Sequence, residues 1–221
     1  MLDGKTILIT GARGALGTIA ADVACDLGAR LILVDIEADD SHRDAQWIGV
    51  DLTDPAATAK ALAGIEVDAL LHIAGGFTCG TSSYAIEDDE WAGMFKSNVD
   101  TLRNVVRHIV PPMIARKRGS IVTVGAISAF TGKGEMGAYC AAKSSVMRLT
   151  ESLAAELRDH GINVNGVAPS IIDTPASRAA MPDADHSRWV SRQSLANIMC
   201  FLCSDEAKDI NGAIIPVAGR V

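Results

Sequence analysis

Short apolar runs rich in Ile, Leu and Val alternate along this chain with longer segments of helical periodicity. The strand-like runs are Thr6–Thr10, Leu31–Asp35, Trp47–Val50, Ala69–Ile73, Ile121–Val124, Asn163–Ala168 and Ala213–Val217. The helical patterns are Ala15–Leu27, Pro55–Leu62, Glu90–Arg116, Gly137–Asp159 and Gln193–Cys203. Such an alternation yields a parallel sheet with helices on both faces, and near-continuous apolar runs are typical of strands buried on both faces. The sequence therefore predicts an α/β fold with a doubly wound parallel sheet of about seven strands.

The chain has 221 residues, which fits one α/β domain and leaves little room for a second core. No repeat, low-complexity tract or Pro/Gly linker divides it, so residues 1–221 are predicted to form a single domain. Polar stretches lie at Glu37–Asp44, Gly76–Asp89 and Asp173–Ser194. The last two follow strands, which is where an open α/β sheet binds its ligands.

The formal charge of −7 argues against nucleic acid or an anionic membrane as a partner, because both would repel the chain. No apolar run approaches the roughly 18 residues of a membrane helix. The N-terminus enters a strand pattern at once, without the apolar stretch of a signal peptide. We therefore expect a cytoplasmic protein that acts on a small molecule.

The five cysteines are odd in number and scattered, which indicates free thiols in a reducing compartment. Cys200 and Cys203 are three residues apart, a spacing that metal ligands sometimes have. Their segment is strongly apolar and offers no further ligands nearby. We interpret both as core residues and expect no metal site.

The first strand runs into a turn with three glycines, Gly11, Gly14 and Gly17, and this turn opens the first helix. The first glycine permits a tight turn, the second lets the backbone approach a pyrophosphate, and the third lets helix and strand pack closely. The pyrophosphate then lies at the helix N-terminus, beside Ala15 and Leu16. This arrangement predicts a dinucleotide-binding domain of the Rossmann type.

Asp35 ends the second strand, 24 residues after Gly11. An acid at this distance is placed to accept a hydrogen bond from the adenosine ribose of NAD. Its carboxylate would repel a 2′-phosphate, so NAD(H) is the expected cofactor. Arg13 keeps NADP(H) open as the alternative, since a basic side chain in this turn can reach a 2′-phosphate.

Tyr139 and Lys143 are four residues apart on a predicted helix and so share one face. A tyrosine with a pKa of about 10 is a weak acid at neutral pH. A neighbouring cation favours the phenolate and is expected to lower that pKa. The pair is a candidate proton-transfer group.

With these motifs the chain resembles the short-chain dehydrogenases and reductases over nearly all its length. The features that carry the resemblance are the glycine turn, Asp35, Asp51-Leu52, His72–Gly75, Asn98, Tyr139 with Lys143, and Pro169–Thr174. The resemblance implies a nicotinamide cofactor and hydride transfer. It also implies a homodimer or homotetramer, because long helices such as Glu90–Arg116 and Gly137–Asp159 pair between subunits in this family.

The resemblance also assigns roles to individual positions. Asp51 and Leu52 correspond to the pair that contacts adenine. Ala74 and Gly75 correspond to the turn beside the adenosine ribose. The segment with Pro169, Ile172 and Thr174 corresponds to the one that holds the nicotinamide carboxamide.

Further roles concern the reaction itself. Asn98 matches the asparagine that supports a water path to the lysine. Tyr139 would exchange the proton with the substrate, and Lys143 would bind the nicotinamide ribose.

One position departs from the family's usual pattern. A serine that orients the substrate carbonyl normally lies thirteen residues before the tyrosine, where this chain has Ala126. Ser128, two residues further along, is the candidate substitute.

Several short islands resemble dihydropteridine reductase, which is similar in lacking the serine and in preferring NADH. They are Gly11–Gly17, Ala74–Gly76, Gly125-Ala126, Asp173–Pro175 and Met181–Asp185. The substrate of that enzyme, a quinonoid dihydropterin, accepts hydride readily, so a polarising hydroxyl matters less.

Three hypotheses follow. The first is an NAD(H)-dependent reductase of a dihydropterin-like or quinonoid compound, with Tyr139 as the proton donor. The second is a ketone, alcohol or 3-oxoacyl dehydrogenase that uses Ser128. The third is an NAD-binding sensor without turnover, which Ala126 favours and the retained Tyr139, Lys143 and Asn98 oppose.

Overall fold

The computed structural model describes residues 1–38 and 44–221 and contains one parallel sheet of seven strands. The strands are β1 (Thr6–Thr10), β2 (Arg30–Asp35), β3 (Gln46–Gly49), β4 (Ala69–His72), β5 (Gly119–Val124), β6 (Ile162–Pro169) and β7 (Ile214–Val217). Their order in the sheet is β3-β2-β1-β4-β5-β6-β7. The predicted fold class and all seven predicted strands are thus confirmed. Residues 39–43 of the polar stretch Glu37–Asp44 lie outside the described residues.

The order of the strands reverses between β1 and β4, and this defines the binding edge. The chain builds outward from β1 to β3 on one side and from β4 to β7 on the other. In register, Thr10 at the end of β1 pairs with both Val34 of β2 and His72 of β4. Ligands of open α/β sheets bind beyond the carboxyl ends of the strands at such a point.

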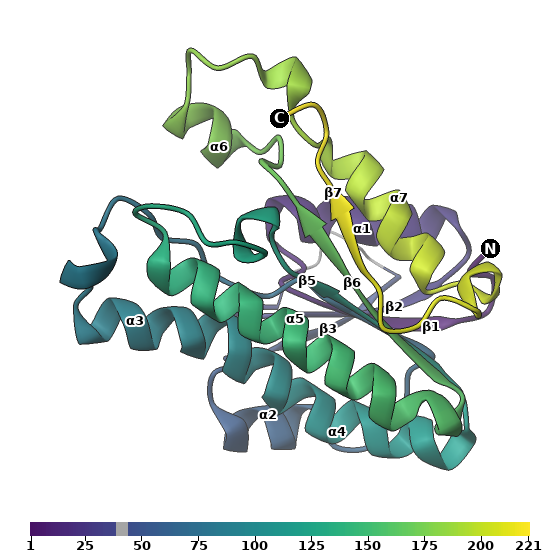
Figure 1. The fold of residues 1–221 in the computed structure, drawn as a ribbon. Helices are drawn as coiled ribbons and strands as arrows, with labels where there is room; N and C mark the ends of the chain where they lie inside the picture. The colour runs from purple at the N-terminus through teal and green to yellow at the C-terminus, as the bar shows by residue number, and fades with distance from the viewer. Residues whose placement is uncertain (39–43) are drawn as a thin grey trace.

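Helices cover both faces of the sheet (Figure 1). Helices α1 (Ala15–Asp26) and α7 (Arg192–Leu202) pack on one face, and α2 (Pro55–Ala61), α4 (Thr101–Arg116) and α5 (Gly137–Leu157) cover the other. Each face has its own apolar core. Cys200 and Cys203 are fully buried in the core beneath α1, in agreement with their interpretation as packing residues.

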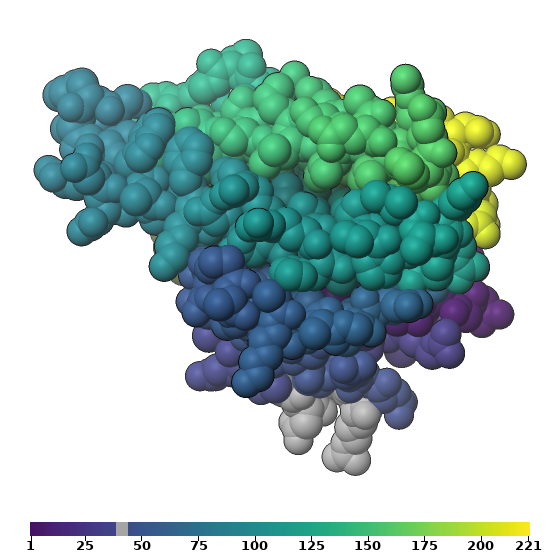
Figure 2. Space-filling view, turned by 90° about the horizontal axis from the view of Figure 1, so that it is seen from below, coloured from purple at the N-terminus to yellow at the C-terminus, as the bar shows by residue number. Residues whose placement is uncertain are grey.

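The predicted helix Glu90–Arg116 is divided into three consecutive parts. Helix α3 (Asp88–Phe95) passes into a π-helical turn, Lys96–Asp100, and then into α4. Single π turns inside helices occur frequently at functional sites, and this one contains Asn98. Helices α4 and α5 lie side by side along the face seen in Figure 2, while the segment that contains α3 projects beyond them.

The polar stretch Asp173–Ser194 contains a helix that the sequence analysis did not predict, α6 (Pro175–Ala180). Its signal is local, because the Thr174 side chain accepts a hydrogen bond from the Ser177 N–H and Pro175 occupies the first helical position. Figure 1 shows α6 beyond the carboxyl end of β6, at the binding edge. Within the described ranges, no helix is long and apolar enough to cross a membrane.

Candidate active site

A cavity of about 680 Å³ lies along the carboxyl edge of the central strands. It collects nearly all the residues that the sequence analysis placed at the cofactor. These are Gly11, Arg13, Gly14, Ala15, Leu16, Gly17, Asp35, Asp51, Leu52, Ala74, Gly75, Tyr139, Lys143, Pro169, Ile172 and Thr174. Two other predicted residues, Asn98 and Ser128, do not line it.

The glycine turn forms a cradle that side chains would fill. Gly11 has a φ of +67°, and a Cβ there would lie 2.9 Å from the backbone nitrogen of Ala74. A Cβ on Gly17 would lie 2.0 Å from the Gly11 carbonyl oxygen. Gly14 caps α1 without a side-chain hydrogen bond, and the first residues of the helix, Ala15 and Leu16, line the cavity. Together with the helix dipole, the N–H groups at a helix N-terminus bind a diphosphate, and the cradle therefore fits a dinucleotide.

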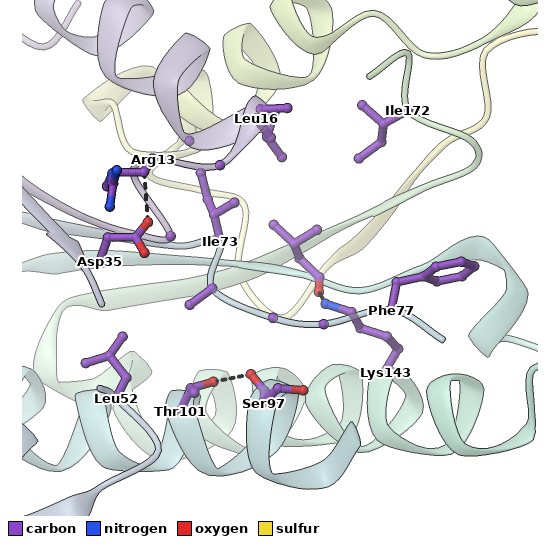
Figure 3. A pocket seen from close by; sticks show the side chains of 18 of the residues that line it. Arg13, Leu16, Asp35, Leu52, Ile73, Phe77, Ser97, Thr101, Lys143 and Ile172 are labelled. Atoms are coloured by element: carbon purple, nitrogen blue, oxygen red, sulfur yellow. Dashed lines mark hydrogen bonds between the residues drawn. The ribbon is translucent and has the colours of Figure 1, made fainter. Parts of the chain in front are cut away.

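The carboxylate of Asp35 is fixed at the mouth of the cavity by two backbone groups. One oxygen accepts a hydrogen bond from the Arg13 N–H at 2.8 Å (Figure 3). The other accepts one from the Ile36 N–H at 2.8 Å. The Arg13 guanidinium donates to Glu37 at 2.7 Å. A negative charge thus lies where an adenosine ribose would enter, and the nearby arginine is engaged by an acid.

Lys143 is buried, and its ammonium donates to the carbonyl oxygen of Val124 at 2.9 Å (Figure 3). Burial lowers the pKa of Lys143 to about 8, because removal from water disfavours the charged form. A Cβ on Gly75 would lie 3.2 Å from the Lys143 nitrogen. The ammonium therefore lies against the turn that follows β4.

Tyr139 differs from the sequence-based expectation in its protonation. Burial, with a smaller contribution from Cys140, raises the pKa of Tyr139 to about 12. The expected lowering of this pKa by Lys143 is not found, and the Lys143 ammonium is directed at the carbonyl oxygen of Val124. Tyr139 also packs against the small apolar cluster of Ala126, Ala129 and Met147. The phenol is consequently protonated at neutral pH.

Asn98 lies behind the cavity and ties the π-helical turn to the loop after β4. Its amide oxygen accepts from the Gly76 N–H at 3.2 Å, and its amide nitrogen donates to the carbonyls of Gly76 at 3.2 Å and Met94 at 2.9 Å. A Cβ on Gly75 would lie 2.6 Å from the amide oxygen. The same Cβ would lie 3.2 Å from the Lys143 nitrogen, so the Asn98 amide oxygen and the Lys143 ammonium lie on the same side of Gly75.

Ser128 lies in a short 3-10 helix, Ile127–Ala129, and is half-buried. Ala126, at the position of the family's usual serine, is 4% exposed. Neither residue belongs to the cavity lining. Phe77 lies over the pocket instead, with its ring edge-on to Tyr139 at a centroid distance of 4.9 Å.

Several lining residues were not predicted from the sequence. They are Ile36, Val50, Thr53, Ile73, Gly76, Phe77, Ser97, Thr101, Val124, Gly125 and Ser170. Most follow the carboxyl end of a strand, so the strand boundaries were a usable signal. Ser97 and Thr101 face the cavity across the π-helical turn, for which the sequence offered no signal.

The match to known proteins agrees with this geometry. The family model for short chain dehydrogenases matches residues 5–185, so the chain belongs to the short-chain dehydrogenases and reductases. It is accordingly an NAD(P)-dependent oxidoreductase.

Individual relatives support this assignment over the full length. The 3-oxoacyl-(acyl-carrier-protein) reductase FabG of Escherichia coli (strain K12) is 30% identical over 237 residues, covering 98% of this chain and 97% of the relative. A gluconate 5-dehydrogenase from Burkholderia cenocepacia J2315, solved with NADP and tartrate, superposes with a TM-score of 0.91 at 27% identity. That match covers 99% of this chain and 95% of the other. Another solved structure, gox2181, has a TM-score of 0.92 at 25% identity and covers 99% and 95%.

We predict that Gly17→Ala weakens NADH binding at least tenfold and lowers the free energy of unfolding by about 1–3 kcal/mol. The reason is the overlap between the new methyl group and the Gly11 carbonyl. Fluorescence titration with NADH and urea unfolding measure the two effects. Gly93→Ala in α3 is the control, since its methyl group meets nothing within 4 Å and alanine favours a helix. If Gly17→Ala bound NADH with wild-type affinity, the proposed role of the glycine turn in cofactor binding would be wrong.

We predict that Lys143 makes stability rise with pH between about 8 and 10. Its pKa is lower in the folded protein, so the unfolded chain binds the proton more readily throughout this window. Relative to Lys143→Met, the wild-type free energy of unfolding should rise by about 1 kcal/mol per pH unit. Urea unfolding of both proteins at pH 7 to 10 tests this. If the free energy of unfolding changed with pH in the same way in both proteins, the Lys143 ammonium would not be desolvated.

Proposed function

We propose that this chain is an NADH-dependent reductase of a conjugated, imine-like acceptor, a quinonoid dihydropterin or a related quinonoid compound. The observation that carries the proposal is a partly buried Tyr139 and a buried Lys143 on one cavity, combined with an alanine at the position of the orienting serine. A ketone needs a hydroxyl that polarises its carbonyl, whereas a quinonoid system already accepts hydride. Ser128, outside the cavity lining, does not offer that hydroxyl from its present position.

Different residues of the chain would bind the cofactor and transfer the proton. When bound, the reduced nicotinamide supplies the hydride. The α1 N-terminus and the glycine turn would hold the diphosphate, and Asp35 would accept from the adenosine ribose. Tyr139 would donate its phenolic proton to the substrate nitrogen or oxygen as the hydride reaches the adjacent conjugated position. The acceptor then gains two electrons and two hydrogens, and Tyr139 recovers its proton along the path beside Lys143 and Asn98.

The protonation of Tyr139 suits the direction of reduction. A phenol with a pKa near 12 carries its proton at neutral pH, so Tyr139 is in the donor form when the substrate binds. It is a weaker acid than free tyrosine, so the transfer requires a substrate atom that becomes strongly basic as the hydride arrives. Lys143, with a pKa near 8, is largely an ammonium at neutral pH. It would bind the nicotinamide ribose and lie beside the path that returns a proton to Tyr139.

A second candidate is a 3-oxoacyl reductase, because the relative FabG of Escherichia coli is 30% identical over nearly the whole chain. In that case the loop that carries Ser128 would have to bring the hydroxyl to the substrate. The two candidates differ in acceptor and in the effect of Ser128→Ala.

We predict rapid NADH oxidation with a quinonoid dihydropterin, and a loss of at least 100-fold in kcat for Tyr139→Phe, which keeps the ring but has no proton to give. Absorbance at the NADH band measures turnover. Ser128→Ala is the control and should keep its rate. Turnover of 3-oxoacyl esters that Ser128→Ala abolishes would replace this proposal with the second candidate. NADH binding without turnover of any acceptor would favour the sensor.

We predict that Asp35→Ser raises the ratio of kcat/KM for NADPH over NADH at least tenfold. The substitution removes a negative charge that would repel a 2′-phosphate and a carboxylate that would hold the ribose of NADH. Steady-state kinetics with both cofactors measures the ratio. Asp54→Asn, at the cap of α2 and outside the cavity lining, removes an equal charge and should leave the ratio unchanged. A wild-type preference for NADPH would contradict the assignment of Asp35.

A further inference from the structure

His72 is a buried histidine whose two ring nitrogens both contact threonine hydroxyls. It is the last residue of β4 and only 2% exposed. Its Nδ1 lies 3.1 Å from Thr10 Oγ1 at the end of β1, and its Nε2 lies 3.3 Å from Thr101 Oγ1 at the start of α4. Both threonines are buried as well. None of the steps proposed above uses this residue.

The partners of the threonines determine the tautomer of His72. Thr10 Oγ1 accepts hydrogen bonds from the N–H groups of Ile73 at 3.1 Å and Ala74 at 3.2 Å. A hydroxyl has two acceptor positions and one proton, so Thr10 must donate that proton to Nδ1. Nδ1 is therefore an acceptor.

The hydrogen bond on the other side of the ring independently indicates the same tautomer. Thr101 Oγ1 donates its proton to the carbonyl oxygen of Ser97 at 2.8 Å, and so it accepts from the imidazole. Nε2 therefore carries the hydrogen, and the ring is neutral. Burial and the charge of Lys143 lower the pKa of His72 to about 3, which agrees with the neutral form.

The two threonines support two different walls of the cofactor cavity. On one wall, Thr10 holds the N–H groups of Ile73 and Ala74, which line the cavity where the chain turns after β4. On the other, Thr101 and Ser97 line the cavity across the π-helical turn that carries Asn98 (Figure 3). One neutral ring thus connects the turn after β4 to the turn that holds Asn98.

We propose that His72, as the Nε2–H tautomer, is a positioning residue that holds these two walls in register. Its Nδ1 side orients the Ile73–Ala74 turn for the cofactor, and its Nε2 side orients the π-helical turn for Asn98 and Lys143. The expected effect of His72 on kcat rests on the proposed reductase function. The assignment of the Nε2–H tautomer rests only on the hydrogen bonds of the ring.

Two substitutions separate the two sides of the ring. The amide of asparagine lies near the position of Nδ1, and the longer glutamine brings its amide near the position of Nε2. We expect His72→Asn to keep NADH affinity within about twofold and to lower kcat by roughly three- to tenfold, the effect of one hydrogen bond. His72→Gln should weaken NADH binding by roughly three- to tenfold and change kcat less.

A matched set of controls distinguishes positioning from general stability. Thr101→Val breaks the same link as His72→Asn, so the double variant should be no slower than either single variant. Thr150→Val breaks a buried pair of hydroxyls, Thr123 and Thr150 at 2.7 Å, away from the cavity. It should lower stability and leave both kinetic constants unchanged.

The direct test is nitrogen-15 NMR of the histidine rings in the intact protein, with the His72 signal identified by its loss in His72→Asn. A neutral ring protonated on Nε2 supports the inference. An Nδ1–H tautomer or an imidazolium would overturn it, as would identical kinetic changes in the asparagine and glutamine variants. Should the wild type bind NADH without turning over any acceptor, the proposed function fails, while the tautomer and the NADH affinities of the variants still decide the role of His72.

Discussion

The backbone contact between Gly11 and the Ala74 turn is the constraint on which the rest of the site depends. The turns after β1 and β4 meet where the strand order reverses, and the distance leaves no room for a side chain on Gly11. This contact brings the α1 N-terminus, Asp35 and the Tyr139–Lys143 pair to the edge of one cavity. A larger residue at Gly11 would separate the turns and, with them, the cofactor cradle from the proton-transfer groups.

Close packing at this edge buries several polar groups. Each of them has a hydrogen-bond partner, and burial shifts the pKa of those that titrate. Lys143 donates to the carbonyl of Val124, Asn98 bonds both backbone groups of Gly76, and His72 joins two threonines. Desolvation dominates the electrostatics, because it lowers the pKa of Lys143 and His72 and raises that of Tyr139. All three shifts favour the neutral form, so the site is held together by hydrogen bonds more than by ion pairs.

Much of this could be predicted from the sequence, because the relevant signals are local. Apolar runs marked the strands, and the glycine turn and Asp35 followed strand ends where backbone geometry determines their positions. The π-helical turn was not predicted, because the extra residue shifts the apolar pattern by only one position and the segment still reads as one continuous helix. Phe77 was missed because it lies in an irregular loop, and its edge-on contact with Tyr139 depends on how β4 and α5 meet. The pKa of Tyr139 was predicted in the wrong direction, because helical spacing shows that Lys143 is near but not where its ammonium points.

The alanine at position 126 connects these observations to the choice of substrate. Its methyl group belongs to the apolar cluster against which Tyr139 packs, so it withdraws water from the phenol and offers no hydrogen bond in return. A serine there would polarise a carbonyl and also stabilise a phenolate, which would make proton removal from an alcohol easier. With alanine, the phenol keeps its proton at neutral pH, and the phenolate that the oxidation of an alcohol requires is disfavoured. An acceptor that is already electrophilic needs only a proton donor, and this favours reduction of a conjugated system over oxidation of an alcohol.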